Sequence, residues 1–182
     1  MATFREFCTG YFKKYFELRP TEAIYYGIAG YDHRLNDYSD ETYRAEKQLV
    51  EESLAELRRI STAELDADQR IDYALLEGKL AIQSYEHAKE DYRLKWPDIY
   101  SPIEAIYILT VRATDDFPAN LLSRLNGTTA LIRQGMANLS QAGANPPKLW
   151  TEMALAGARG SVRFLENLPD HPKVQNAGIE IS

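Results

Sequence analysis

Histidine, the side chain most often used for metal binding and for proton transfer near neutral pH, occurs three times in this chain, at His33, His87 and His171. A helical zinc-hydrolase site needs two histidines one turn apart with a glutamate between them, so that the metal ligands and the general base share one face. The three histidines lie far apart, and none has a second histidine or a cysteine at ligand spacing. We therefore predict no catalytic residue, no metal ligand and no cofactor site in this chain. A site that the fold assembles from all three histidines is the less favoured alternative.

Other motifs that carry chemistry lack their minimum parts. No glutamate lies three residues before a histidine, as a two-metal helical bundle would need. The pairs Glu51-Glu52 and Asp115-Asp116 put neighbouring carboxylates on different faces of a helix, where they do not share a proton. Gly157-Ala-Arg-Gly160 lacks the lysine and the spacing of a phosphate-binding loop. We expect solvated helix residues at all of these positions.

Cys8 is the only cysteine, which excludes a disulfide within the chain. It lies among Phe4, Tyr11, Phe12 and Tyr15 at helical spacing. A reactive thiol needs a cationic and partly open setting. We therefore expect Cys8 to be a small core residue.

The best candidate for a polar functional element is the loop Tyr31-Asp32-His33-Arg34, which groups an acid, an imidazole and a guanidinium beside Gly30. The favoured interpretation is structural: Asp32 accepts backbone N–H groups in the turn, and Arg34 pairs with the end of a neighbouring helix. The twelve tyrosines are likewise expected at the edges of the core rather than in a carbohydrate or peptide groove. No binding residue is assigned.

The composition excludes several classes of partner. The chain has 27 acidic and 21 basic residues and no basic run longer than a pair, so it lacks the positive surface that nucleic acids require. No window approaches the roughly 18 apolar residues of a membrane span, and the N-terminal MATFREF lacks the apolar stretch of a signal peptide. The residues as given indicate a cytoplasmic protein without nucleic-acid or membrane partners. An export signal removed beforehand would leave no trace in them.

Apolar spacing and capping residues predict an all-α fold, an array of about six to seven antiparallel helices with short loops and no sheet. The helices are expected over residues 4–18, 20–30 and 39–60, from Asp66 or Asp68 to about Lys89, from a capping box at Ser101–Glu104 through Val111, over 118–139 with an interruption at Asn126-Gly127, and over 148–167.

Burial follows from the same patterns. On the helix that ends near Lys89, Ile71, Leu75, Ile82 and Tyr85 are expected to be buried with Leu76 and Leu80. The helix over residues 101–111 is apolar nearly all round and is expected to be deeply buried. Residues 1–170 are predicted to form one helical N-terminal domain. Residues 171–182 are predicted to be a tail or the start of a missing continuation, because Val174 and Ile179 have no obvious partner.

Several segments together resemble the opening of a bacterial family called domain of unknown function 885. They are Leu18-Arg-Pro20-Thr-Glu22-Ala, Tyr26-Gly27-Ile28, Gly30-Tyr-Asp32-x-Arg34-Leu35, Asp68-Gln-Arg70-Ile-Asp72-Tyr73 and Leu149-Trp-Thr. Their order and separations agree with the family over most of the chain, to about Pro169.

The resemblance implies a metallopeptidase-like parent. Full-length members of the family resemble zinc-dependent peptidases and carry His-Glu-x-x-Pro-Gly-His with a further glutamate beyond it, and no position of this chain matches those residues. It therefore implies zinc as a cofactor and a peptide as a substrate of the parent, with no functional residue carried over here. By fold-level analogy with helical zinc peptidases, this non-catalytic N-terminal segment would shape one wall of a substrate channel.

Two hypotheses remain open. In the first, the chain is the N-terminal part of such a protein, and the missing C-terminal part or a second copy covers apolar side chains that it leaves exposed. In the second, it is a self-sufficient helical interaction module without enzymatic activity, and its apolar side chains are completely buried.

Overall fold

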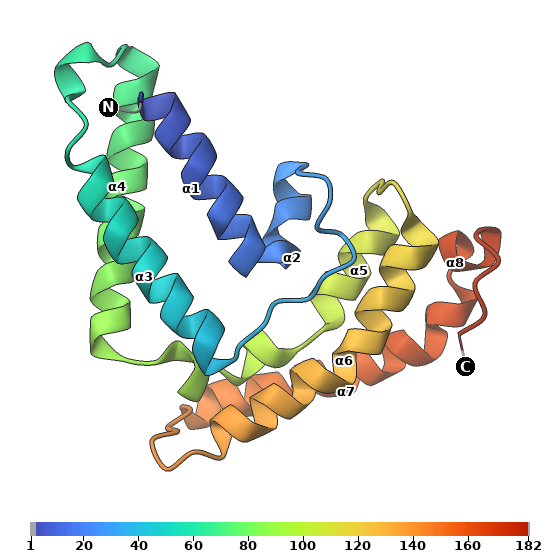
Figure 1. Ribbon diagram of the computed structural model, residues 1–182. Coiled ribbons are helices and arrows are strands. Elements are labelled where there is room, and N and C mark those ends of the chain that lie inside the picture. Colours follow the sequence, from blue (N-terminus) through green and yellow to red (C-terminus); the bar gives the residue numbers. More distant parts are fainter. Residues whose placement is uncertain (1–2, 182) are drawn as a thin grey trace. The chain divides into compact units, whose positions relative to one another are not determined.

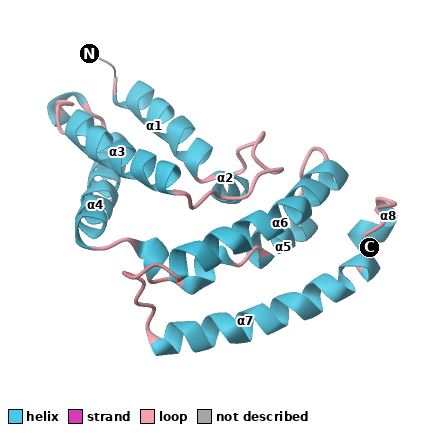
Figure 2. Ribbon diagram, turned by 60° about the horizontal axis from the view of Figure 1, so that its bottom comes forward, coloured by secondary structure: helices cyan, strands magenta, loops and turns pink. Residues whose placement is uncertain are grey.

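The computed structural model describes residues 3–181, and within that range the chain contains helices and no strand (Figure 2). The predicted all-α fold is confirmed. The chain divides into two compact units: unit 1 comprises the residues up to Leu18 together with Ser39–Asp91, and unit 2 comprises Arg19–Tyr38 together with the residues from Tyr92 onward. The division at residue 170 that the sequence suggests stays a prediction.

Unit 1 consists of three helices that lie side by side, α1 (Phe4–Leu18), α3 (Asp40–Leu57) and α4 (Ala67–Lys89) (Figure 1). The Ser39 side chain caps α3 by accepting the Thr42 N–H at 3.2 Å. Asp66 and Gln69 form a capping box at the start of α4. These two starts agree with the sequence because a cap depends only on residues within one turn.

The helices α3 and α4 are antiparallel, as predicted. Near the start of α3, the Tyr43 hydroxyl donates to the Glu90 carbonyl just beyond the end of α4, at 3.3 Å. After the end of α3, Arg58 Nε lies 2.9 Å from Glu77 Oε1 in the middle of α4. The core between the three helices is built from residues of all of them, including Phe7, Tyr11, Leu49, Leu54, Leu57, Leu76 and Leu80.

The predicted burial of α4 is wrong for one of its two apolar faces. Leu76 and Leu80 pack against the other helices of unit 1, whereas Ile71, Leu75, Ile82 and Tyr85 are exposed. The contrast is sharpest between sequence neighbours, because Leu75 is 68% exposed and Leu76 only 7%. Neighbouring positions differ by about 100° around a helix, so α1 and α3 cover one face and leave the other open.

Unit 2 contains α2 (Pro20–Ala23), α5 (Ile103–Val111), α6 (Phe117–Leu139), α7 (Lys148–Asn167) and α8 (Pro172–Asn176). The helix predicted over 20–30 is shorter than expected. After Ala23 the chain tightens into a 3-10 helix at Ile24–Tyr26, and Gly27 then takes a left-handed conformation with φ of 68°. Glycine has no Cβ to oppose that conformation, so the helix ends there.

The α6 helix is continuous through Asn126-Gly127, which contradicts the predicted interruption. A Cβ at Gly127 would lie 3.1 Å from Leu35 Cδ1, so the glycine gives Leu35 room to pack against the helix. Tertiary packing therefore outweighs the low helix propensity of glycine. The predicted capping box at Ser101–Glu104 is also wrong, because α5 begins after Pro102 with no side-chain cap. The expected deep burial of α5 holds for Ile106 and Leu109 but not for Tyr107 or Val111, which are exposed.

The C-terminal residues are packed rather than loose. Val174 on α8 is fully buried in a cluster with Ile106, Leu109 and Leu168. Lys173 Nζ donates to the Leu109 and Arg112 carbonyls, each at 2.6 Å, and so satisfies the C-terminal end of α5. The expectation that Val174 and Ile179 lack partners is wrong, since Ile179 packs against the same cluster.

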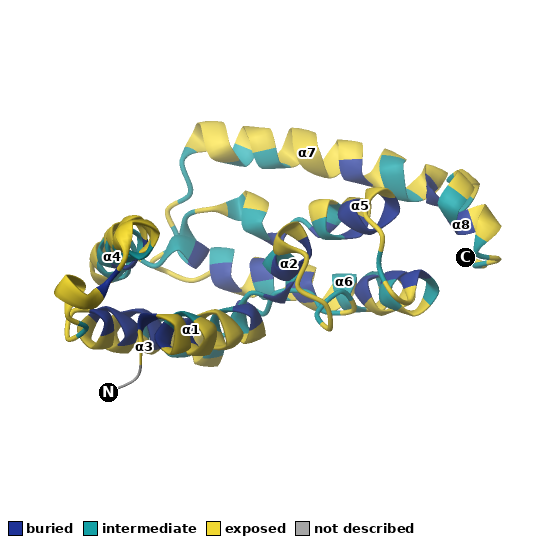
Figure 3. Ribbon diagram, turned by 90° about the horizontal axis from the view of Figure 1, so that it is seen from above, coloured by how far each residue is buried: buried dark blue, intermediate teal, exposed yellow. Residues whose placement is uncertain are grey.

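The α7 helix begins and ends where the sequence predicts, but it is exposed over most of its length (Figure 3). Of its residues only Ser161 is buried, while Met153, Leu155 and Val162 are each more than half exposed.

Candidate functional site

The three histidines are divided between the two units. His33 is exposed in a loop of unit 2, and His87 lies on α4 of unit 1, with its ring 5.6 Å from that of Tyr43. His171 precedes α8, where its Nδ1 accepts the Lys173 N–H at 3.2 Å. Among residues 3–181 there is no group of three or more His, Cys, Asp or Glu side chains placed to hold a metal ion.

Cys8 is half-buried on α1. Burial raises the pKa of its thiol, and the negative charge of Asp72 raises it further. Both effects disfavour the thiolate, so the surroundings of Cys8 are those of an inert thiol.

The loop at residues 31–34 is a turn closed by the Arg34 N–H, which donates to the Tyr31 carbonyl at 2.9 Å. The guanidinium of Arg34 lies 5.8 Å from the centroid of the Tyr31 ring. Asp32 does not fix the turn as expected, because its Oδ1 is buried without a hydrogen-bond partner among the described residues. Instead, the negative charge of Asp32 acts to raise the pKa of Arg124 on α6.

Arg124 on α6 is a buried charged residue that the sequence patterns did not single out. It is fully buried, and its Nη1 donates to the Ala105 carbonyl while Nε and Nη2 find no acceptor in the described part of the chain. Burial lowers its pKa to about 10, and the negative charge of Asp32 acts in the opposite direction. The available signal was its place on the apolar stripe of α6, three residues after Leu121 and seven before Leu131.

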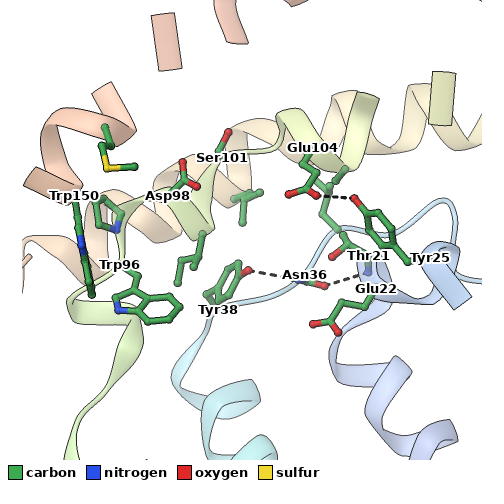
Figure 4. A pocket seen from close by; sticks show the side chains of 16 residues that line it. Thr21, Glu22, Tyr25, Asn36, Tyr38, Trp96, Asp98, Ser101, Glu104 and Trp150 are labelled. Carbon is green, nitrogen blue, oxygen red and sulfur yellow. Dashed lines mark hydrogen bonds between the residues drawn. The ribbon is translucent and has the colours of Figure 1, made fainter. Parts of the chain in front are cut away.

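A pocket with a volume of about 790 Å³ lies within unit 2 (Figure 4). Its lining comes from α2, the following loop, the 3-10 helix at Pro97–Tyr100, α5, α6 and the first turns of α7. Three carboxylates line it, those of Glu22, Asp98 and Glu104, and none of the 16 lining residues is a lysine, arginine or histidine.

Asn36 and Tyr38 order one wall of the pocket. Asn36 Oδ1 accepts the Thr21 N–H at 3.2 Å, and its Nδ2 donates to the Tyr38 hydroxyl at 3.4 Å (Figure 4). The Tyr38 carbonyl in turn accepts from Arg93 Nη1 and from Asn138 Nδ2, each at 3.0 Å. Buried hydrogen bonds therefore join this loop to Asn138 on α6 and to Arg93, and they hold this wall of the pocket in place.

A second wall of the pocket contains Tyr25 and Glu104, which are joined by a hydrogen bond. The Tyr25 hydroxyl donates to Glu104 Oε1 at 2.8 Å. Burial, together with the hydrogen bond and the negative charge of Glu104, raises the pKa of Tyr25 to about 12. The phenol therefore stays protonated at neutral pH and keeps donating to the carboxylate.

Trp96 and Trp150 form the aromatic end of the pocket, with ring centroids 5.5 Å apart in an edge-to-face arrangement. Trp96 is 47% exposed and Trp150 36%. Lys95 Nζ lies 5.8 Å from the centroid of the Trp150 ring. Partly exposed tryptophans beside a cavity are typical of ligand-binding surfaces.

The sequence patterns did not predict this pocket. They placed the tyrosines at core edges, which fits Tyr38, but Tyr25 and Tyr38 also line the cavity. One signal was present, because Glu22 and Trp150 both lie in segments that carry the family resemblance. The segments that meet here are far apart in the chain, so local patterns could not join them.

A second candidate surface is the outer face of α4, which we define by Ile71, Leu75, Gly78, Ile82 and Tyr85. Successive members are separated by four, three, four and three residues, the spacing of a seam that packs against another helix. The four apolar members are each at least 59% exposed. Gly78 lies at the middle of the face, and a Cβ placed there would meet nothing within 4 Å.

Comparisons with known proteins give a family and a fold. The family model described as "Bacterial protein of unknown function (DUF885)" matches residues 20–179. A solved structure from Shewanella oneidensis, described as "a putative lipoprotein of unknown function", superposes with a TM-score of 0.76 at 21% sequence identity. The match covers 94% of this chain and 32% of that one, so the present chain spans about a third of the similar protein. A search of curated proteins finds no match. No helix in the described range is both long and apolar enough to cross a membrane.

Proposed function

The chain belongs to the bacterial family of unknown function DUF885, and from this premise we propose that it is a non-catalytic helical segment whose outer faces pack against further parts of a longer protein. In a zinc-peptidase-like parent, which the family resemblance implies, the segment would shape one wall of the substrate channel. The proposal assigns no catalytic residue to this chain.

The observation that carries the proposal is the exposed outer face of α4. Burying a large apolar side chain stabilises a protein by about 1.5–3 kcal/mol, and monomers rarely leave such side chains together in one patch. Four of them at a helix-packing spacing indicate a surface that is made to be covered. The small Gly78 in the middle would let a partner helix approach closely.

The length of the similar protein supports the proposal that further chain covers this face. Two thirds of the Shewanella oneidensis chain lie outside the match, which covers 32% of it. We propose that further chain of that extent covers the outer face of α4 and the exposed side of α7. A cytoplasmic location stays a prediction, and the similar protein is the one described as a lipoprotein.

The alternative is a self-sufficient helical interaction module without enzymatic activity. The burial of Val174 and Leu168, which are at most 1% exposed, favours it. Both residues pack inside unit 2, in the cluster that also contains Ile106 and Leu109.

The reading frame after Ser182 gives the first test. Continuation into a His-Glu-x-x-Pro-Gly-His motif supports the proposal, and a stop codon directly after Ser182 overturns it in favour of the interaction module.

Where the frame continues, the chain is co-expressed with the downstream polypeptide and the complex is isolated. We expect the double substitution Leu75→Lys and Ile82→Lys to abolish the complex, because it places two charges in the seam. A matched control, Gln48→Lys with Ala55→Lys, adds the same charge at exposed positions of α3 and should leave the complex intact. A complex that tolerates the α4 substitutions contradicts the proposed role of that face.

A further inference from the structure

We propose that the pocket of unit 2 is a binding site for an organic cation, a protonated amine attached to an apolar group. This inference goes beyond the packing role proposed above and does not depend on what covers α4, because every residue that lines the pocket belongs to unit 2.

The charge of the lining selects the sign of the ligand. Glu22, Asp98 and Glu104 contribute three carboxylates, and the lining contains no basic side chain (Figure 4). An anionic ligand would meet like charges on several sides, whereas an ammonium group would meet acceptors. From the residues that the structure describes, Glu104 accepts one hydrogen bond, from Tyr25 at one oxygen, and a carboxylate has about four acceptor positions.

Basic side chains also lie near the pocket, and the positive charges of Arg124 and Arg112 act on Tyr25 in its wall. Arg19 donates to the Tyr92 hydroxyl, and its guanidinium lies 5.3 Å from the centroid of the Tyr38 ring. Lys95 lies over the Trp150 ring, and Arg124 donates to the Ala105 carbonyl. These groups reduce the negative potential around the pocket, but they are not among the residues that face the cavity.

The aromatic walls explain why the cation should be organic. Trp96 and Trp150 present ring surface at one end, and Met153 and Ile99 add apolar surface. An ammonium ion is attracted to the face of an indole, and the apolar part of the ligand gains by leaving water. The volume of about 790 Å³ lies in the range of roughly 300–1,000 Å³ that is common for small-molecule sites.

A metal ion fits the pocket less well than an ammonium group. A divalent cation needs several oxygen ligands converging on one point, and no such group of acidic side chains occurs between residues 3 and 181. Carboxylates that are spread over a cavity provide a diffuse negative field, which suits an ammonium ion.

Intrinsic fluorescence tests the inference directly, because the chain has only two tryptophans and both line the pocket. The intact 182-residue chain is titrated with three probes that share the phenethyl group: phenethylamine, which is cationic; 2-phenylethanol, which is neutral; and 3-phenylpropanoate, which is anionic. We expect a saturable change in tryptophan emission with phenethylamine, weaker binding of the alcohol and no binding of the acid. A titration with the tripeptide amide Phe-Gly-Gly-NH2 then distinguishes a peptide amino terminus from a small free amine as the source of the cation.

The charge dependence is tested with isosteric variants. We expect the triple substitution Glu22→Gln, Asp98→Asn and Glu104→Gln to weaken phenethylamine binding by about tenfold or more, since each partly exposed ion pair contributes a few-fold. Glutamine at position 104 can still accept from Tyr25, so the wall should keep its hydrogen bond. The control Glu166→Gln removes a charge from an exposed position near the other end of α7 and should leave binding unchanged.

Three results would overturn the inference. They are equal binding of the acid and the amine, a loss of affinity with Glu166→Gln as large as that with the triple variant, and the absence of any saturable change with all the probes. The last result would indicate that the pocket is only space left for further chain.

Discussion

Gly135 on α6 lies directly against the ring of Tyr100, so closely that a Cβ at position 135 would be 2.5 Å from Tyr100 Cγ. Tyr100 is buried, its hydroxyl donates to the Arg93 carbonyl at 2.8 Å, and Asn138 Nδ2 donates to that hydroxyl at 2.9 Å. Because Gly135 has no side chain, the 3-10 helix at Pro97–Tyr100 can pack against α6. This packing places Asp98 in the lining of the pocket.

We expect Gly135→Ala to lower the free energy of unfolding by about 1–3 kcal/mol, because the new methyl group must displace a buried ring. Gly78→Ala is the matched control in a helix interior, since a Cβ there meets nothing within 4 Å. The control should raise stability by roughly 0.5–1 kcal/mol through the better helix propensity of alanine. Urea unfolding followed by circular dichroism measures both, and equal effects of the two substitutions would contradict the close approach at Tyr100.

The two faces of α4 give a second prediction. Leu76→Ala should cost about 2–5 kcal/mol because it opens a cavity in the core of unit 1, whereas Leu75→Ala should cost less than about 0.5 kcal/mol. Urea unfolding of the isolated chain checks the difference. If Leu75→Ala costs as much as Leu76→Ala, the outer face of α4 is covered within the chain itself, and the proposed packing surface is wrong.

Arg124 and Asp32 give a third prediction. A buried guanidinium depends on nearby negative charge, so Asp32→Asn should lower the free energy of unfolding by about 1–3 kcal/mol. In a chain that also carries Arg124→Met, the same Asp32→Asn change should cost much less, because no buried positive charge remains. A double-mutant cycle from urea unfolding measures the coupling, and additive effects would show that the two charges do not interact.

Tyr25 gives a prediction on pH. Its pKa in the folded chain, about 12, is higher than the ordinary value of 10.0, so the protonated phenol is favoured by folding. The contribution of Tyr25 to stability should therefore be fully present below pH 10 and be lost as the pH rises through 12. The difference in urea midpoint between the native chain and Tyr25→Phe should shrink over that window. A difference that stays constant from pH 8 to pH 12 would argue against the hydrogen bond to Glu104.

Local signals were sufficient for most helix boundaries. The limits of α1 and α7 and the starts of α3 and α4 agree with the sequence, because prolines and capping side chains act within one turn of the chain. Three local predictions failed: Ser101 does not cap α5, Gly127 does not interrupt α6, and the helix that starts at Pro20 ends before Gly30. At Gly127 a contact from a distant residue, Leu35, outweighed the local preference, and at Glu104 the carboxylate accepts from the distant Tyr25 hydroxyl.

The amino-acid sequence by itself determined that this protein is helical, that it belongs to its family and that the histidines lack ligand spacing. These properties depend on residues within a few positions of one another or on the order of short segments. Only the tertiary structure decided which apolar face of α4 is buried, that Arg124 is enclosed, and that Glu22, Asp98, Glu104 and Trp150 line one cavity. The physical reason is that burial depends on which other helix covers a face, and a periodic pattern identifies apolar faces without identifying what covers them.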